Sequence, residues 1–172
     1  MEGAAAAHPL MATAWPLLSS ALAWLLGSLL VGAIANRLPP AWLERGQASP
    51  SWDNAAFYAR RLAIRRWKRW LPDAGSALPG GVGKSSLVGR DPAPLRRLLL
   101  ETQRAEWVHR LLWPLWMLTA LWLPPAGVLL NLLVACALNL PCLAAQRHTR
   151  RRLERILARQ GSRATHERAA LR

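Results

Sequence analysis

Residues Glu101 to His109 form the part of the chain whose residue types best support chemistry, with the sequence Glu-Thr-Gln-Arg-Ala-Glu-Trp-Val-His. On a helix, Glu106 and His109 share the face that Leu95 and Leu98 begin. A carboxylate and an imidazole three residues apart are neighbours on a helix surface. Such a pair suits general-base catalysis, because the carboxylate fixes the imidazole tautomer and the other ring nitrogen takes a proton. We therefore predict that Glu106 and His109 act together.

The neighbouring polar residues extend this candidate site. Glu101 and Arg104 flank the stripe and are expected to form a supporting ion pair, and Thr102 lies on the stripe itself. We count Glu101 among the catalytic candidates, and Thr102 and Arg104 among the substrate-binding ones. The alternative is that these side chains only solvate a helix end or reach toward lipid headgroups. Because the stripe leads into an uncharged segment at Leu111, a functional role is a serious hypothesis.

Other kinds of site are not indicated. The four histidines are scattered, so no metal-ligand spacing appears, and no GxSxG nucleophile motif is present. The segment Gly81–Ser85 resembles the end of a phosphate-binding loop, but Leu78 stands where that motif needs its first glycine. The sequence predicts neither a metal nor a cofactor.

The composition limits the class of protein. The 172 residues are 52% hydrophobic and carry 23 Lys and Arg against 9 Asp and Glu, a net charge of +14. The sequence pI is about 11.8 and the mean hydropathy is +0.08. So many apolar residues exclude a disordered chain, and two cysteines cannot form a disulfide framework.

The charges are absent from two long segments. Nothing is charged between Ala12 and Ala35 or between Leu111 and Ala145. About 20 apolar residues cross the ~30 Å hydrocarbon core of a bilayer, so both segments indicate a membrane protein. The first segment could alternatively be a signal peptide cleaved near Ala33–Ala35, but it lacks the usual positive N-terminal region. We expect it to be retained as a transmembrane helix.

The basic residues lie in two blocks, 37–110 and 147–172. The positive-inside rule places both blocks in the cytoplasm and the N-terminus outside. The apolar stretch between them must then enter the membrane and return, and the tandem prolines Pro124-Pro125 are the expected turning point.

The two arms of this stretch differ in length. The arm 111–123 is too short to span comfortably at ~1.5 Å per residue, which favours a hairpin or a re-entrant span. A single crossing at 126–145 is the alternative, and it would place the basic blocks on opposite sides.

Three further helices are expected. Asp53 to Leu71 is typical of one basic amphipathic helix. Such a helix could bind either nucleic acid or anionic lipid headgroups. Because it lies beside membrane segments in the sequence, we expect it to bind lipid and not nucleic acid. The second helix opens at Asp91 or Ala93 with two prolines in its first turn. The third is a basic helix from Gln146 that ends at Gly161.

The fold class predicted is all-α, an integral membrane protein in four parts. These are an N-terminal transmembrane segment (1–36), a basic cytoplasmic or interfacial helical region (37–110), an apolar membrane hairpin broken at Pro124-Pro125 (111–145), and a basic juxtamembrane helix (146–172).

The order of motifs resembles a known family over roughly residues 36–160. The chain is similar to the glycosyl-4,4'-diaponeurosporenoate acyltransferases of staphyloxanthin-type carotenoid synthesis. The Glu101–His109 run is the most specific part. The other matching motifs are Phe57-Tyr58-x-Arg60, Trp67-Lys68 with Leu71-Pro72-Asp73, Asn139-x-Pro141 and Gln146-Arg147-x-x-Arg150.

The resemblance implies a multi-pass enzyme of the bacterial cell membrane that transfers a fatty acyl chain to a sugar hydroxyl of a glycosylated carotenoid or related lipid glycoside. The acyl donor would be acyl-CoA or an acyl carrier protein, and membrane lipids would surround the chain. His109 would deprotonate the hydroxyl and Glu106 would orient it, while Arg104 or Arg147 would bind the anionic donor or stabilise the oxyanion. The matching motifs add Arg60, Asn139 and Arg150 to the substrate-binding candidates. The rival hypothesis is a non-enzymatic membrane protein that acts as an assembly partner.

Overall fold

The computed structural model describes residues 9–44, 50–71 and 92–170, and in these ranges the chain forms helices and no strands. This part of the chain confirms the all-helical prediction. The elements in order are α1 (Pro9–Arg37), α2 (Pro40–Glu44), α3 (Ala55–Arg60), α4 (Ile64–Trp67), η1 (Lys68–Trp70), α5 (Pro92–Leu112), η4 (Trp113–Leu121) and α6 (Pro125–Ala170).

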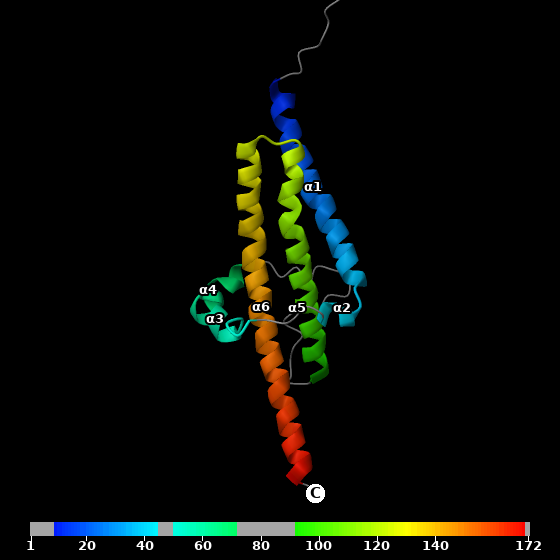
Figure 1. The fold of residues 1–172 in the computed structure, drawn as a ribbon, viewed down its shortest axis with the longest axis vertical. Helices are drawn as coiled ribbons and strands as arrows, with labels where there is room; N and C mark the ends of the chain where they lie inside the picture. Colours follow the sequence, from blue (N-terminus) through cyan, green and yellow to red (C-terminus); the bar gives the residue numbers. More distant parts are fainter. Residues whose placement is uncertain (1–8, 45–49, 72–91, 171–172) are drawn as a thin grey trace, which may run out of the picture.

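Three long rods lie side by side and make up most of the molecule (Figure 1). Helix α5 continues as the 3-10 helix η4, and this rod runs antiparallel to the first half of α6. Helix α1 packs on α5 and η4, whereas α3 and α4 pack on α6. We call the line of contact between the α5–η4 rod and α6 the α5–α6 seam.

The chain reverses between η4 and α6. The backbone N–H groups of Trp122 and Leu123 both donate to the Thr119 carbonyl oxygen, at 3.2 and 2.9 Å, and end the rod. Helix α6 then begins at Pro125, a position where a missing N–H costs no helical hydrogen bond. The second proline of the Pro124-Pro125 pair thus opens the returning helix.

Helix α6 is one uninterrupted helix of 46 residues. The predicted end at Gly161 is wrong, and the apolar and basic parts of the helix are not separated by a break. A glycine inside a helix costs only ~1 kcal/mol relative to alanine, so it need not end one. Beyond it, the Ser162 hydroxyl still donates to the Ala158 carbonyl oxygen across one helical turn, at 3.1 Å.

The basic middle segment is also not the single helix that its spacing predicted. The side-chain oxygen of Asn54 accepts from the backbone of α3 and caps it, but the chain turns at Ala63, whose φ is 47°. Residues six positions apart on a straight helix point about 120° away from each other. The turn lets Tyr58 and Ile64, both buried, share the interior, and wraps α3 and α4 around α6.

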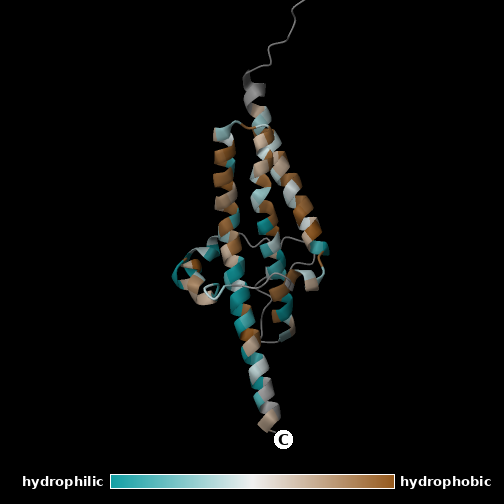
Figure 2. Ribbon diagram, viewed as in Figure 1, coloured by the Kyte–Doolittle hydropathy of each residue, from teal (hydrophilic) through white to brown (hydrophobic). Residues whose placement is uncertain are grey.

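Apolar and polar residues occupy different ends of the rods. Hydrophobic residues dominate α1, η4 and the first half of α6, and hydrophilic residues dominate the other end (Figure 2). Two segments, Ala14–Arg37 and Pro125–Arg163, are long and apolar enough to cross a membrane. Seven leucines of α1 are more than half exposed: Leu17, Leu18, Leu22, Leu25, Leu26, Leu29 and Leu30.

Side chains at several levels fix α1 to the seam. Near the chain reversal, Trp122 Nε1 donates to Ser20 Oγ at 3.0 Å, and Trp24 Nε1 donates to Asn131 Oδ1 at 2.9 Å. At the other end of α1, Arg104 Nε donates to the Ala35 carbonyl oxygen at 3.1 Å. Helix α1 therefore runs beside the α5–η4 rod along most of its own length.

Candidate active site

A buried ion-pair network closes the polar end of the seam. Glu106 on α5 and Arg150 on α6 each have side chains 1% exposed, and their Oε1 and Nε atoms are 2.7 Å apart. The second oxygen of Glu106 accepts a hydrogen bond from Arg110 at 3.2 Å and lies 3.6 Å from Nε of Arg147. One carboxylate thus holds three guanidinium groups and fastens α5 to α6.

Asp53 extends the network to the segment before α3. Its Oδ2 accepts a hydrogen bond from Arg151 at 2.8 Å and lies 3.8 Å from Arg150, while Tyr58 donates to Oδ1 at 2.6 Å. Glu154, on the next turn of α6, pairs with Arg151 at 2.8 Å. Three carboxylates therefore meet four arginines, and the network keeps an excess of positive charge.

Burial shifts the proton affinities of this network. Burial raises the pKa of the Glu106 carboxyl, although Arg150, Arg110 and Arg147 act against that rise. Burial and the hydrogen bond to Asp53 raise the pKa of Tyr58 to about 12. Tyr58 is therefore a neutral hydrogen-bond donor at physiological pH.

His109 lies further toward the apolar end of the seam and faces Asn139 of α6. The His109 Nδ1 and Asn139 Oδ1 atoms are 3.1 Å apart, and the amide nitrogen of Asn139 donates to the Ala135 carbonyl oxygen at 3.0 Å. Because the amide nitrogen of Asn139 is hydrogen-bonded to Ala135, its amide oxygen faces His109. This oxygen can only accept a hydrogen bond, so Nδ1 of His109 must carry the proton. The lone pair is then on Nε2, the form that a general base needs.

This geometry changes the predicted pairing. Nδ1 of His109 is bound by Asn139, and both oxygens of Glu106 face arginines. The orienting group is therefore Asn139, which the motif comparison had placed among substrate-binding residues, and Glu106 instead anchors Arg147 and Arg150. The spacing of three correctly put Glu106 and His109 on adjacent turns but could not reveal a partner on another helix.

The remaining predicted residues lie in other surroundings. Glu101 and Arg104 form the expected ion pair at 2.6 Å, and Arg104 also binds α1. The buried Thr102 hydroxyl donates to the Leu98 carbonyl oxygen of its own helix at 2.8 Å. Arg60 is exposed on α3 and lines a shallow hollow of about 230 Å³ with Trp52 and Phe57. The structure thus gathers Glu106, His109, Asn139, Arg147 and Arg150 at one part of the seam. Within the described ranges, no side-chain hydrogen bond or ion pair joins Glu101, Thr102, Arg104 or Arg60 to this group.

Several network members were not identified from the sequence. In the sequence, Asp53 indicates only a helix start and Tyr58 only part of a motif. The signal that could have found Asp53 is the scarcity of acidic residues, since Asp53, Glu106 and Glu154 are three of only nine. Within the described ranges, no group of three or more His, Cys, Asp or Glu side chains is placed to hold a metal ion.

The fold and site define a helical protein with two helices of membrane-crossing length and a polar site where its apolar region begins. A family model described as glycosyl-4,4'-diaponeurosporenoate acyltransferase matches residues 39–159, and the chain belongs to this family. The predicted resemblance is thereby confirmed, and the chain is an acyltransferase of carotenoid glycoside modification. The matched range contains every predicted site residue. No curated protein and no solved structure matches the chain.

Proposed function

We propose that this protein is a multi-pass acyltransferase of the bacterial cell membrane that esterifies a sugar hydroxyl of a glycosylated carotenoid, or a related lipid glycoside, with a fatty acyl chain. The observation that carries the proposal is the position of His109. Its Nε2 takes no hydrogen bond from the described residues, and it lies on the seam between a cationic network and an apolar region. An acceptor with a polar sugar and an apolar tail requires such a boundary.

The reaction proceeds as acyl transfer from a thioester donor of the acyl-CoA or acyl carrier protein type. The sugar hydroxyl gives its proton to Nε2 of His109 while its oxygen attacks the thioester carbonyl carbon. The resulting oxyanion collapses, the carbon–sulfur bond breaks, and the thiolate leaves with the proton from His109. Asn139 keeps the ring in the required tautomer throughout.

Arg147 is the best placed group for the negative charges of the donor or oxyanion. Its side chain is 27% exposed and its Nε lies 3.6 Å from Glu106. Because the network carries more guanidinium than carboxylate groups, this edge of the seam attracts anions. Arg150 is fully enclosed and instead fixes the shape of the network.

The exposed apolar side chains support placement in a membrane. Leaving one leucine side chain in water costs about 1.5–3 kcal/mol, so the seven leucines of α1 together cost on the order of 10 kcal/mol. That is comparable to the whole net stability of a domain, about 5–15 kcal/mol. Hydrocarbon around α1 and the η4–α6 hairpin removes this cost.

The contacts of α1 also support the depth of the hairpin. The chain reversal after η4 lies beside Ser20 of α1, and the polar end of α5 lies beside Ala35. These two residues are about 22 Å apart along α1. A hairpin of that depth crosses most of the ~30 Å hydrocarbon core and returns to the side where both basic blocks lie.

The proposal is tested in cells that make a glycosylated carotenoid, with and without this protein. Extracted pigments should show, only when the protein is present, a glycoside heavier by one fatty acyl ester. An unchanged glycoside in membranes that contain the protein would mean that this compound is not the acceptor. Supplying other lipid glycosides in the same extract assay then tests the broader acceptor class.

A further inference from the structure

The contacts along the α5–α6 seam form an ordered series that continues past His109. After the His109–Asn139 pair comes a contact between Trp113 Nε1 and Cys136 Sγ, at 3.5 Å. An apolar cavity of about 540 Å³ follows between η4 and α6, lined by Trp116, Ala120, Leu123, Pro125, Val128, Leu129 and Leu132. The cavity therefore lies on the same line of contact as the candidate base.

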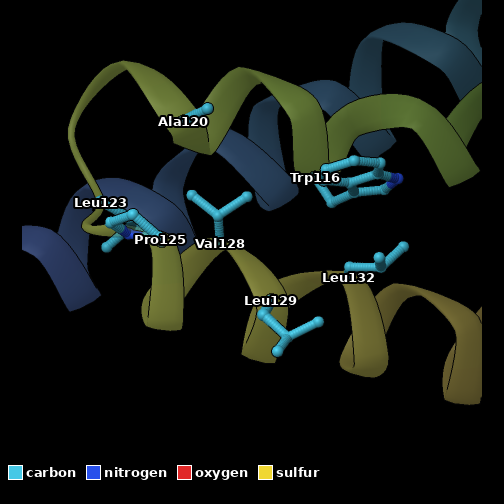
Figure 3. Close-up of a pocket in the computed structure, with 7 residues that line it drawn as sticks. All are labelled: Trp116, Ala120, Leu123, Pro125, Val128, Leu129 and Leu132. Carbon is cyan, nitrogen blue, oxygen red and sulfur yellow. The ribbon is translucent and has the colours of Figure 1, made fainter.

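Figure 3 shows how this cavity is bounded. Trp116 and Leu132 lie at one end, and Leu123 and Pro125 lie at the other, where the chain reverses. Ala120 is the smallest lining side chain on η4, and Val128 and Leu129 line the groove from α6 across from it. The result is an open apolar groove between η4 and α6, with Leu123 and Pro125 at the end near the hairpin turn and Trp116 and Leu132 at the end nearer to His109 in the sequence of contacts.

We propose that this groove holds the alkyl chain of the acyl donor during transfer and limits its length. This inference rests on the proposed function. A volume of about 540 Å³ lies within the ~300–1,000 Å³ typical of small-molecule sites. Apart from the indole N–H of Trp116, the lining side chains are apolar, which suits a hydrocarbon chain.

The length of the seam favours an acyl chain over the carotenoid. From His109 to Leu121 at the end of η4 the rod rises about 22 Å, with ~1.5 Å per residue in α5 and ~2.0 Å in η4. Acyl chains of one bilayer leaflet fill about half of the ~30 Å core, so an extended fatty chain fits this distance. A rigid conjugated polyene of a carotenoid is straight and longer than this distance.

The inference is tested by changing the width of the groove and measuring which chains are transferred. Membranes with the protein receive the glycosylated acceptor and an equimolar mixture of acyl-CoA donors of increasing chain length, and mass spectrometry gives the ester distribution. A120F fills the groove near its middle and should shift the products several-fold toward shorter chains. L129A widens the groove and should shift them toward longer chains.

A matched control separates this effect from general damage to the hairpin. A137F introduces the same side chain at an exposed position of α6 that does not line the groove, and its product distribution should equal that of the wild type. If A120F and L129A also leave the distribution unchanged, the groove does not select the chain.

A second measurement keeps the inference testable if A120F does not accumulate or if no ester forms at all. A fatty acid with a photoreactive diazirine at its chain end, incubated with the wild-type protein in membranes, should crosslink within residues 116–132. Crosslinks confined to α1 would overturn the assignment. Absence of ester together with crosslinks at the groove would count against the proposed function and in favour of the groove.

Discussion

At the scale of single residues, two hydrogen bonds orient the His109 ring in the way that the proposed proton transfer requires. The Ala135 carbonyl oxygen turns the Asn139 amide, and the amide oxygen then holds the proton of His109 on Nδ1. Neither contact involves a charged group. The ring is therefore oriented by Asn139 and not, as the local spacing predicted, by the carboxylate of Glu106. Glu106 forms ion pairs with arginines instead.

The Tyr58–Asp53 bond makes a direct prediction about pH. Tyr58 is the only tyrosine, so the near-ultraviolet absorbance of tyrosinate reports its titration alone. We expect a midpoint at about 12, with a lower value in D53N because that change weakens the hydrogen bond to a carboxylate and removes the nearby negative charge. The folded state favours the neutral phenol, so the stability from this group is complete below pH 10 and is lost as pH rises toward 12. Y58F supplies the blank, and a wild-type midpoint near 10 would show that Tyr58 is neither buried nor hydrogen-bonded to Asp53.

Glu106 should be far more important for stability than Glu101, although each forms an ion pair on α5. Removing a partner from a buried pair costs about 3–5 kcal/mol, because a buried charge remains uncompensated. An exposed pair is worth about 0–1 kcal/mol. Arg150 is 1% exposed, whereas Glu101 and Arg104 are 30% and 22% exposed. Thermal unfolding in detergent should show a large fall in Tm for E106A and little change for E101A; equal falls would contradict the network.

Sequence reasoning at this scale succeeded only for local partners. The Glu101–Arg104 pair follows from a spacing of three on one helix and is present. The partners of His109 and Glu106 lie 30 and 44 positions further along the chain, on α6. Helical periodicity reveals which face of its own helix a residue occupies. It does not reveal which residue of another helix lies opposite, because that depends on how the two helices are aligned in the folded protein.

At the scale of elements, Gly27 sets the approach of α1 to η4. A Cβ atom built there would lie 2.5 Å from Leu115 Cδ1, a contact that the flexible end of Leu115 can relieve for alanine but not for a large side chain. G27L should therefore push α1 from η4 and lower the Tm in detergent. G32L is the matched control, because nothing lies within 4 Å of Gly32. Equal stability of the two variants would exclude close packing at Gly27.

The element boundaries show where residue patterns suffice and where they do not. Pro92 marks the start of α5 within one residue of the expected position, because a proline is favoured in the first helical turn. The break at Ala63 carries no glycine or proline signal, since it arises from burying Tyr58 and Ile64 together. Gly161 indicates a helix end in the sequence, but α6 continues through it because a glycine inside a helix costs little free energy.

At the scale of the whole molecule, the seam sets the topology we propose. Leu95 and Leu98 near the start of α5 pack on Leu153 of α6. This contact holds the polar start of α5 beside the polar second half of α6. Single cysteines at Arg96 and Arg155, in a chain with both native cysteines replaced by serine, should therefore react with a membrane-impermeant thiol reagent from the same, cytoplasmic side. Labelling from opposite sides would instead establish a single crossing between them.

The central claim is that His109 is the base of an acyl transfer at the membrane boundary. The most direct measurement is ester formation by purified wild-type and His109→Ala proteins, each reconstituted with glycosylated carotenoid and a fatty acyl thioester. Loss of a general base lowers rates by about 10²–10⁴-fold, so His109→Ala should form almost no acylated glycoside while inserting normally into the membrane. Wild-type rates of ester formation by His109→Ala would contradict the account.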